Sequence, residues 1–329
     1  MRMRRQSKII YLFLGILFFC VADSFAYKKH ALLVGISDYE NNKAVKQDNR
    51  FNNINGKTDV NLMAPVLQKQ GFQVKKLVNR EATHNAIITN LKSLASKCSA
   101  GDIVYIHFST HGQLVEDLNG DEADGWDEAI IPYDAQKMYR KGVYEGQNHL
   151  LDDELSIYVD KIRKRLGETG MLYVVIDACH AGTSSRGKPL FFDIAGLNDS
   201  EEEKDIPSPE PAVGPSRFSG VVFSKNSKIY KRSNNKVHKD FIQLRKEVGK
   251  SPVVFMEACR SDELSHEVEY AKDKNCGPLT YHIHKVLQNT NITKNDGWIQ
   301  TVKKNFDSDI IIQKRRAALR QHMVIEKAK

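Results

Sequence analysis

The 329-residue sequence lacks several features that would assign it to a common functional class. It has no internal repeat, which argues against solenoids and propellers. It contains no motif of aromatic and basic residues for nucleic-acid recognition, so its formal net charge of +8 does not by itself indicate a nucleic-acid partner. Its hydrophobic content of 41% and charged content of 27% are ordinary for a soluble globular protein.

The N-terminus holds an apolar run that is short for a membrane-spanning helix. A basic stretch ending at Lys8 precedes the apolar run Ile9–Val21, and Ser24-Phe25-Ala26 follows it. These are the three regions of a secretory signal peptide. We therefore expect residues 1–26 to be a removable leader and the mature chain to be secreted or periplasmic, beginning near Tyr27. An uncleaved membrane anchor is the alternative.

The mature chain would keep too few cysteines for a dense disulfide framework, and it is large enough not to need one. The four that remain are Cys98, Cys179, Cys259 and Cys276. A single bond between Cys259 and Cys276 is left open, because sequence alone gives no distance between them. Only Cys179 lies in a motif that suggests a reacting thiol.

Apolar runs alternate with amphipathic stretches along the mature sequence, and this pattern predicts an α/β fold with a mostly parallel sheet flanked by helices on both faces. The predicted strands are Ala31–Ile36, Phe72–Val78, Ile103–Phe108, Met171–Ile176 and Val253–Met256. The predicted helices are Lys57–Gln70, Thr83–Lys97, Asp152–Leu166, Pro278–Leu287 and, near the C-terminus, Asp309–Met323.

The stretch at about 183–250 breaks this periodicity. It holds the acidic cluster Glu201–Glu203, a proline-rich segment and then basic residues from Lys225 to Lys236. Such a composition predicts a long exposed loop or linker. It is either an insertion without a role of its own or a processing segment that a protease specific for basic residues could cut.

Two predicted strands end in polar motifs. Ser109-Thr110-His111-Gly112 follows the first, and Asp177-Ala178-Cys179-His180 follows the second. Because ligands bind beyond the carboxyl ends of the strands in an open α/β sheet, His111 and Cys179 can meet there. A cysteine attacks a carbonyl as the thiolate, and a nearby imidazole can take its proton and later protonate the leaving amine. The backbone N–H of Gly112 is a candidate oxyanion donor, together with that of Cys179.

These motifs resemble those of the caspase-like cysteine peptidases, and the metacaspases most closely, with their typical Ser-Gly-His-Gly and Asp-x-Cys-His-Ser-Gly. The resemblance continues in order through Ala31–Ile36, Tyr39, Asn55–Asp59, Leu151–Leu155, Glu257–Glu263, Glu267 and Gly277–Tyr281. It departs at Thr58, Thr110 and Ala181, none of which removes a reacting group. The resemblance implies a caspase-like peptidase domain over 27–290, followed by a C-terminal extension at 291–329, mostly helical.

The position of Asp177 predicts which bond is cut. Side chains at i and i+2 of a strand share a face, so Asp177 should lie beside Cys179 and Ser109 beside His111. A carboxylate near the nucleophile attracts a cationic substrate side chain. By resemblance, Asp59, Ser109 and Asp177 would line a pocket for Arg or Lys, and we expect cleavage after these residues and not after Asp. The alternative for Asp177 is an orienting or helix-capping carboxylate.

An acidic stretch after His111 raises the question of calcium. Asp117, Asn119, Asp121 and Glu128 fall at positions 1, 3, 5 and 12 of an EF-hand loop. However, Glu122 takes the place of the required glycine, and a strand-like run precedes the loop. The metacaspase resemblance instead suggests calcium ligation by Asp127, Asp152 and Asp153, with a solvated acidic loop as the alternative. We expect no cofactor to be required, and calcium is left open.

Two other functions are compatible with parts of the sequence. A zinc site built from His111, Cys179 and His180 is disfavoured, because adjacent Cys179 and His180 should diverge and no further ligand pair has suitable spacing. The stronger rival is an inactive caspase-like fold that serves as a binding or regulatory module. The prediction is therefore an exported cysteine endopeptidase that acts on protein or peptide substrates.

Overall fold

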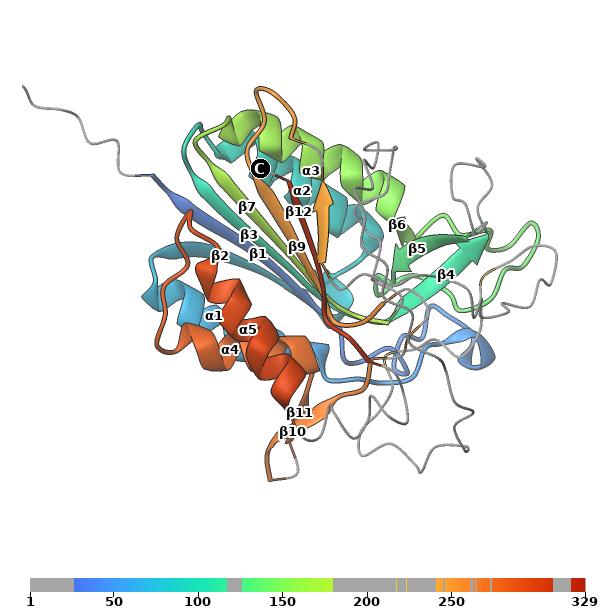
Figure 1. The fold of residues 1–329 in the computed structure, drawn as a ribbon. Helices are drawn as coiled ribbons and strands as arrows, with labels where there is room; N and C mark the ends of the chain where they lie inside the picture. Colours follow the sequence, from blue (N-terminus) through green and yellow to red (C-terminus); the bar gives the residue numbers. More distant parts are fainter. Residues whose placement is uncertain are drawn as a thin grey trace, which may run out of the picture.

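The structure is a computed structural model that describes residues 27–116, 126–179, 217, 223, 241–244, 246–260, 263, 265–272, 274–309 and 321–328. Within these residues, seven strands form a central sheet in the order β2-β1-β3-β7-β9-β12-β8 (Figure 1). The strands are β1 (Lys29–Gly35), β2 (Phe72–Val78), β3 (Ile103–Ser109), β7 (Met171–Asp177), β8 (Phe241–Leu244), β9 (Val253–Glu257) and β12 (Val324–Ala328).

The five strands from β2 to β9 run parallel, and β12 is antiparallel to β9. The central strands β3 and β7 are buried along their whole length. This explains why their sequences are apolar without alternation, since both faces of the sheet are covered. Their register sets Ser109 opposite Asp177, so the two polar motifs begin at neighbouring strand ends.

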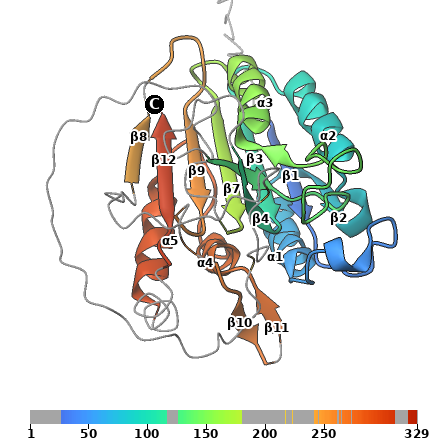
Figure 2. The same ribbon diagram turned by 90° about the vertical axis from the view of Figure 1, so that its right-hand side faces the viewer.

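Helices cover both faces of the sheet (Figures 1 and 2). Helices α2 (His84–Lys97) and α3 (Asp152–Leu166) contribute Ile87, Leu91 and Ile162 to one apolar core. On the other face lie α1 (Gly56–Lys69), α4 (Pro278–Leu287) and α5 (Gly297–Ser308), which share a second core with the sheet. The predicted α/β class is confirmed, and the first four predicted helices and all five predicted strands are present within one or two residues of their expected ends.

The C-terminal part differs from the expected helical extension. Helix α5 buries Trp298, Val302 and Phe306 in the core it shares with α1 and α4. Strand β12 then pairs with both β9 and β8 inside the central sheet. The domain therefore does not end at residue 290. Of the predicted helix 309–323, residues 309 and 321–323 are not helical, and 310–320 lie outside the described residues.

Two smaller sheets lie beyond the ends of the central strands. One joins β4 (Gly112–Glu116), β5 (Trp126–Ile130) and β6 (Leu150–Leu151), and the other is the hairpin of β10 (Val268–Ala271) and β11 (Lys274–Cys276). Because β4 begins at Gly112, the first of these sheets starts directly after His111. Both sheets are short, and neither was predicted from the sequence.

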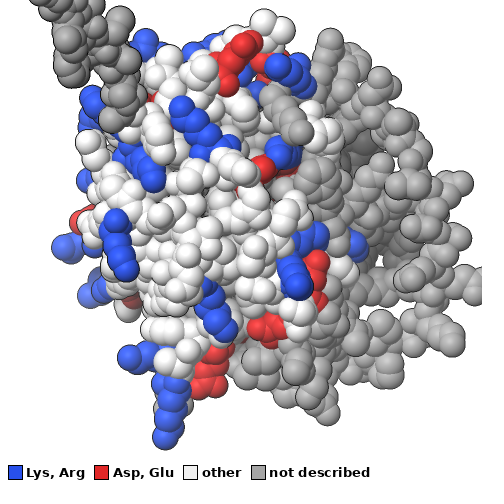
Figure 3. All heavy atoms as spheres, turned by 60° about the vertical axis from the view of Figure 1, so that its left-hand side comes forward, with Lys and Arg blue, Asp and Glu red and all other residues white. Residues whose placement is uncertain are grey.

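The surface charge and the chain ends bear on the expected partners and on the expected leader. On the face shown in Figure 3, Lys and Arg side chains are scattered among uncharged ones rather than gathered in one patch. Among the described residues, no helix is both long and apolar enough to cross a bilayer. The expected leader, residues 1–26, lies outside them, as does most of the expected linker.

The four cysteines of the expected mature chain are buried and form no disulfide with one another: Cys98, Cys179, Cys259 and Cys276. The bond between Cys259 and Cys276 that the sequence left open is therefore absent.

Candidate active site

Two side chains from neighbouring elements meet at the carboxyl end of the central sheet. Asp59 projects from the first turn of α1 and is fully buried. The hydroxyl of Ser109, at the end of β3, donates a hydrogen bond to Asp59 Oδ2 over 2.5 Å. Helix α1 can approach this closely because it begins at a glycine. A Cβ atom on Gly56 would lie 2.2 Å from the carbonyl oxygen of Ser109.

The N-terminus of α4 holds the carboxylates of Asp59 and Asp177. Asp177 Oδ2 accepts hydrogen bonds from both the backbone N–H and the hydroxyl of Thr280, each at 2.7 Å. Gly277 N donates to Asp59 Oδ1 over 3.0 Å. The first N–H groups of a helix lack partners within the helix and carry positive partial charge, so they suit buried carboxylates. A side chain at Gly277 would overlap Asp177, since its Cβ would lie 2.1 Å from Oδ2.

A third carboxylate, Glu267, completes what we call the carboxylate cluster: Asp59, Asp177 and Glu267. Glu267 is fully buried and accepts a hydrogen bond from the backbone N–H of Asn55 over 2.6 Å. Burial raises the pKa of Asp177 to about 6, with nearby Asp59 adding to the rise and Arg217 opposing it. Like charges this close repel one another, so the cluster favours a cation at its centre.

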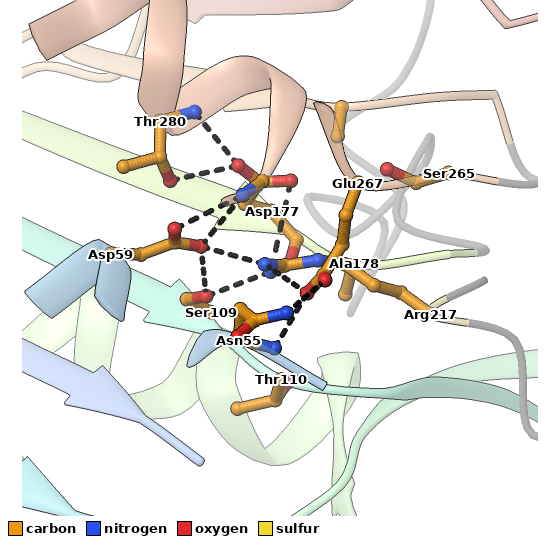
Figure 4. Close-up of polar contacts among 12 residues, drawn as sticks. Asn55, Asp59, Ser109, Thr110, Asp177, Ala178, Arg217, Ser265, Glu267 and Thr280 are labelled. Atoms are coloured by element: carbon orange, nitrogen blue, oxygen red, sulfur yellow. Dashed lines mark hydrogen bonds and ion pairs between the residues drawn. The ribbon is translucent and has the colours of Figure 1, made fainter. Parts of the chain in front are cut away.

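The guanidinium of Arg217 occupies that centre (Figure 4). Its Nη2 lies 2.7 Å from Asp59 Oδ2 and 3.1 Å from Glu267 Oε1. Its Nη1 donates to the hydroxyl of Ser109 and to the main-chain oxygen of Asp177, each over 2.7 Å, and lies 3.8 Å from Asp177 Oδ1.

Arg217 is fully buried, although it belongs to the stretch expected to be an exposed linker. Burial alone would lower its pKa, but the three carboxylates raise the pKa above its ordinary value. A planar guanidinium presents its donors as a fork, which is why it can bridge several carboxylate and hydroxyl oxygens at once.

His111 lies just beyond the cluster and is 1% exposed. Its ring stacks on Phe51 and lies tilted against Tyr39, with centroid separations of 5.5 and 5.1 Å. Its Nδ1 is 2.7 Å from the carbonyl oxygen of Arg217, and its Nε2 is 2.8 Å from that of Asn52. Burial lowers the pKa of His111 to about 4, although both carbonyl contacts act to raise it. Burial thus favours the neutral imidazole, whereas donation to both carbonyl oxygens at once would require a proton on each nitrogen.

Cys179 follows the end of β7 and is also 1% exposed. Its Sγ accepts a hydrogen bond from the backbone N–H of Ser265 over 3.0 Å, and it lies 3.4 Å from the carbonyl oxygen of the same residue. Gly112 touches the peptide of Cys179, because a Cβ atom on Gly112 would lie 1.8 Å from the carbonyl oxygen of Cys179. This contact joins the His111 motif to the Cys179 motif.

The backbone of Arg217 lies between these two motifs. Its carbonyl oxygen accepts a hydrogen bond from Gly112 N over 3.3 Å and also contacts His111. Its N–H donates to the carbonyl oxygen of Ser265 over 3.0 Å, on the residue whose N–H reaches Cys179 Sγ. The structure therefore places His111 and Gly112 at the carbonyl oxygen of Arg217 and links the N–H of Arg217 to Cys179 through Ser265. Asp59, Ser109 and Asp177 surround the side chain of the same arginine.

The residues expected to bind calcium lie on other elements. Asp127 is on β5, and Asp152 and Asp153 are in the first turn of α3. Among the described residues, no three His, Cys, Asp or Glu side chains are arranged to hold a metal ion. Residues 117–125 of the acidic loop lie outside them, and so does His180 of the disfavoured zinc site. Glu128 lies within β5, so a strand stands where an EF-hand needs its second helix.

Sequence reasoning missed Arg217, Ser265 and the placement of Glu267. Nothing near Arg217 marks it as buried, since it lies in a stretch rich in proline and charge. The basic residues of the predicted processing segment, from Lys225 onward, lie outside the described residues. A useful signal would have been the surplus of buried carboxylates, because Asp59 and Asp177 together need a cation.

Comparison with known proteins shows the family and the fold. A family model described as Caspase domain matches residues 28–327. The chain therefore belongs to the caspase domain family of cysteine peptidases, and the expected caspase-like fold is confirmed. It is 28% identical over 277 residues to Metacaspase-1 of Schizosaccharomyces pombe, covering 79% of this chain and 60% of that protein. It is 35% identical over 167 residues to Metacaspase-2 of Arabidopsis thaliana, covering 47% of this chain and 35% of that protein.

A solved structure of a Geobacter sulfurreducens protein matches with a TM-score of 0.55 at 18% identity, covering 92% of this chain and 93% of that one, which shows a shared fold. The chain spans less than two thirds of the length of the two curated relatives named above.

Proposed function

We propose that this protein is a cysteine endopeptidase in which Cys179 is the nucleophile and His111 the acid–base partner. The support is geometric: both motifs lie at neighbouring strand ends, His111 contacts the carbonyl oxygen of Arg217, and Cys179 is linked to the N–H of Arg217 through Ser265. The N–H of Gly112 points at the same carbonyl oxygen, as an oxyanion donor must. His111 contacts the same oxygen, so its ring lies within reach of the bond that would break.

The enzyme would cut after Arg or Lys. The single observation that carries this specificity is the guanidinium of Arg217 among three buried carboxylates, with two further acceptors on Ser109 and Asp177. An arginine side chain of a substrate could take the same contacts. An aspartate side chain would add a fourth negative charge to a buried cluster, which is strongly unfavourable.

Matched fluorogenic peptides with Arg, Lys or Asp before the reporter test this proposal directly. We expect hydrolysis of the Arg and Lys peptides, none of the Asp peptide, and complete loss of hydrolysis in Cys179→Ala. Preference for Asp would overturn the specificity. Cleavage that survives in Cys179→Ala would overturn the nucleophile. An intact chain that binds the peptides without cutting them would instead indicate the binding module considered above.

Export of the enzyme to the periplasm or the medium is also proposed, on the strength of the N-terminal motif alone. The run Ile9–Val21 and the small residues before Tyr27 support it. N-terminal sequencing of protein recovered from each cell fraction tests it. A mature protein that begins near Tyr27 outside the cytoplasm is expected, and a full-length cytoplasmic protein would contradict it.

A further inference from the structure

We propose that His107 is a positioning residue of the substrate pocket, and that through the hydroxyl of Thr280 it keeps Asp177 in the orientation and the charge state that bind a cationic side chain. The pocket is the one that the carboxylate cluster and Ser109 form. This inference rests on the proposed cleavage after Arg or Lys and deepens it, because it names a residue whose own hydrogen bonds reach neither the dyad nor the cluster.

His107 is a buried ionisable side chain that the proposed mechanism does not use. It lies in β3, two residues before Ser109, and is fully buried. Its Nε2 is 3.0 Å from the hydroxyl oxygen of Thr280, and its Nδ1 is 3.2 Å from that of Tyr105. A buried imidazole or phenol is costly unless its polar atoms are paired. The two side chains of β3 therefore belong to one hydrogen-bonded chain, which leads to Thr280 in the first turn of α4.

The protons of this chain have one direction. The hydroxyl and the backbone N–H of Thr280 both donate to Asp177 Oδ2, each over 2.7 Å (Figure 4). A hydroxyl has a single proton, so Thr280 Oγ1 can only accept from His107. Burial, together with the charge of Arg217, lowers the pKa of His107 to about 3, so the ring is neutral and its one proton lies on Nε2. The Nδ1 atom is then an acceptor, and the hydroxyl of Tyr105 donates to it.

The chain determines how Asp177 faces the pocket. Its Oδ2 is taken by the two donors of Thr280, which leaves Oδ1 for a cation, and Oδ1 lies 3.8 Å from Arg217 Nη1. Burial raises the pKa of Asp177 to about 6, whereas both bonds from Thr280 act against that rise, because a donor stabilises the ionised carboxylate. A protonated Asp177 loses its attraction for a cationic substrate, so Thr280 affects the charge of the pocket as well as its geometry.

The ring of His107 decides whether the hydroxyl of Thr280 can act in this way. With its proton on Nε2, the ring occupies a lone pair of Thr280 Oγ1 and turns the hydroxyl proton toward Asp177. With the proton on Nδ1, Nε2 would itself accept the hydroxyl proton, and Oγ1 would face Asp177 with a lone pair, which favours the protonated acid. Successive hydrogen bonds also polarise one another, so each donor strengthens the next.

Other charged and titratable groups face Asp177 or the guanidinium beside it, and a test has to leave them unchanged. Among the described residues these are Asp59, Tyr105, Arg217, Glu267 and Cys276. Burial, with nearby carboxylates adding to the effect, raises the pKa of Tyr105 and of Cys276 above their ordinary values, so both are neutral over the pH range of an assay. A substitution of His107 keeps all five groups, so their contributions cancel in the comparison with the parent protein.

The pH dependence of kcat/KM for an Arg peptide tests the inference. His107→Leu removes the donor and should move the acid limb upward by about 0.5 pH unit, with KM about threefold higher at pH 5.5 and nearly unchanged at pH 8. The value of kcat should not change, because Asp177 binds the substrate without reacting. His107→Gln keeps a donor and should restore the parent profile. His30→Leu is the matched control: it removes another buried histidine, in β1, and should leave the acid limb in place.

A double-mutant cycle shows whether His107 acts through Thr280. Thr280→Val should move the acid limb upward by itself, and adding His107→Leu should move it no further. A full additional shift in the double variant would overturn the positioning role, and so would a parent-like profile in His107→Leu. If His107→Leu does not fold, Tyr105→Phe removes only the first donor of the chain and should move the limb in the same direction by a smaller amount; a limb that stays in place would count equally against the role.

Nitrogen NMR of a histidine-labelled Cys179→Ala protein gives a readout that needs no activity. His107, assigned by the loss of its signals in His107→Gln, should carry its proton on Nε2 at pH 7.5, and a proton on Nδ1 would overturn the proposed direction of the chain. The outcomes also separate this inference from the function on which it rests. If the parent hydrolyses the Arg peptide but His107→Leu keeps its pH profile, the positioning role fails and the peptidase function stands. If the parent hydrolyses no peptide, the function fails and the role in substrate binding fails with it.

Discussion

Replacing Arg217 tests the charge balance of the site independently of catalysis. In a Cys179→Ala background, which prevents cleavage, Arg217→Ala leaves three buried carboxylates without the cation that lies 2.7 Å from Asp59 and 3.1 Å from Glu267. Removing one partner of a buried ion pair costs roughly 3–5 kcal/mol. Water that enters beside the released chain reduces this cost, so we expect a loss of about 3 kcal/mol in the free energy of unfolding at pH 7.5.

The loss should shrink on acidification. The pKa of Asp177 is already raised to about 6, above its unfolded value, so its protonated form is favoured in the folded state and stability is recovered as pH falls. The charge of Arg217 opposes that rise, and its removal would raise the pKa further. Protonation at a pKa of about 6 occurs in the parent as well and cancels in the difference, so the gap narrows at pH 5.5 by the contribution of the further rise alone.

Urea unfolding of the two proteins at pH 7.5 and 5.5 measures both effects, since histidines common to both largely cancel in the difference. His107 and His111 do not cancel, because Arg217 helps to lower the pKa of each; their contribution to the difference has the same sign as that of Asp177. Lys225→Ala in the same background is the matched control and should leave the free energy of unfolding unchanged. Equal stability of Arg217→Ala and its parent at pH 7.5, or a gap that widens at pH 5.5, would refute the reasoning.

Three other predictions concern the pocket, acid stability and calcium. Glu267→Gln keeps the acceptor for Asn55 but removes a charge, so kcat/KM for an Arg peptide should fall about tenfold; an unchanged value would exclude Glu267 from the pocket. Among the described residues, burial lowers the pKa of five histidines below the unfolded value: His107, His111, His149, His282 and His284. Stability is therefore lost as pH falls from about 6.5 toward 4, by about 2 kcal/mol between pH 7 and 5 for His111 alone. Urea unfolding should show a lower midpoint at pH 5, and a higher one would contradict the cited shifts. The calcium hypothesis predicts that a chelator lowers peptidase activity and that added calcium restores it, and an unchanged rate would reject it.

The parts of the fold that the sequence predicted are those whose signal is local. The runs that became β3 and β7 are buried on both faces, and they stand out as continuous apolar stretches. Strand β12 was missed because its sequence, Val324–Ala328, is short and contains Glu326 and Lys327. Its place in the sheet depends on pairing with β9, some seventy residues earlier in the chain. Pairing between distant segments leaves no periodic pattern in the sequence, so a short window of residues cannot reveal it.

The residues of the site also fall into two groups, those with a local sequence signal and those placed by contacts between distant segments. His111 and Cys179 follow strong strand patterns, so their convergence at neighbouring strand ends could be predicted from the topology of a parallel sheet. Glu267 could not be placed, because it lies in an irregular stretch before β10 and its contacts, with Asn55 and Arg217, are to residues far away in the sequence. The calcium candidates Asp127, Asp152 and Asp153 came from the metacaspase resemblance, and they lie on β5 and in the first turn of α3. Calcium binding by them stays a prediction.

Arg217 shows why composition is a poor guide to burial in a charged linker. Its surroundings in the sequence predict exposure, and a lone buried arginine would be expensive. However, the folded domain supplies the other half of an ion cluster, since Asp59, Asp177 and Glu267 are buried around the guanidinium. The arginine also donates hydrogen bonds to Ser109 and to the main-chain oxygen of Asp177. If the same carboxylates select the substrate, stability of the uncut chain and preference for arginine have one physical origin. A substitution of Asp59, Asp177 or Glu267 that lowers the stability of the uncut chain should lower the preference for arginine in proportion. Plotting the free energy of unfolding of the uncut variants against their selectivity for Arg peptides checks this relation.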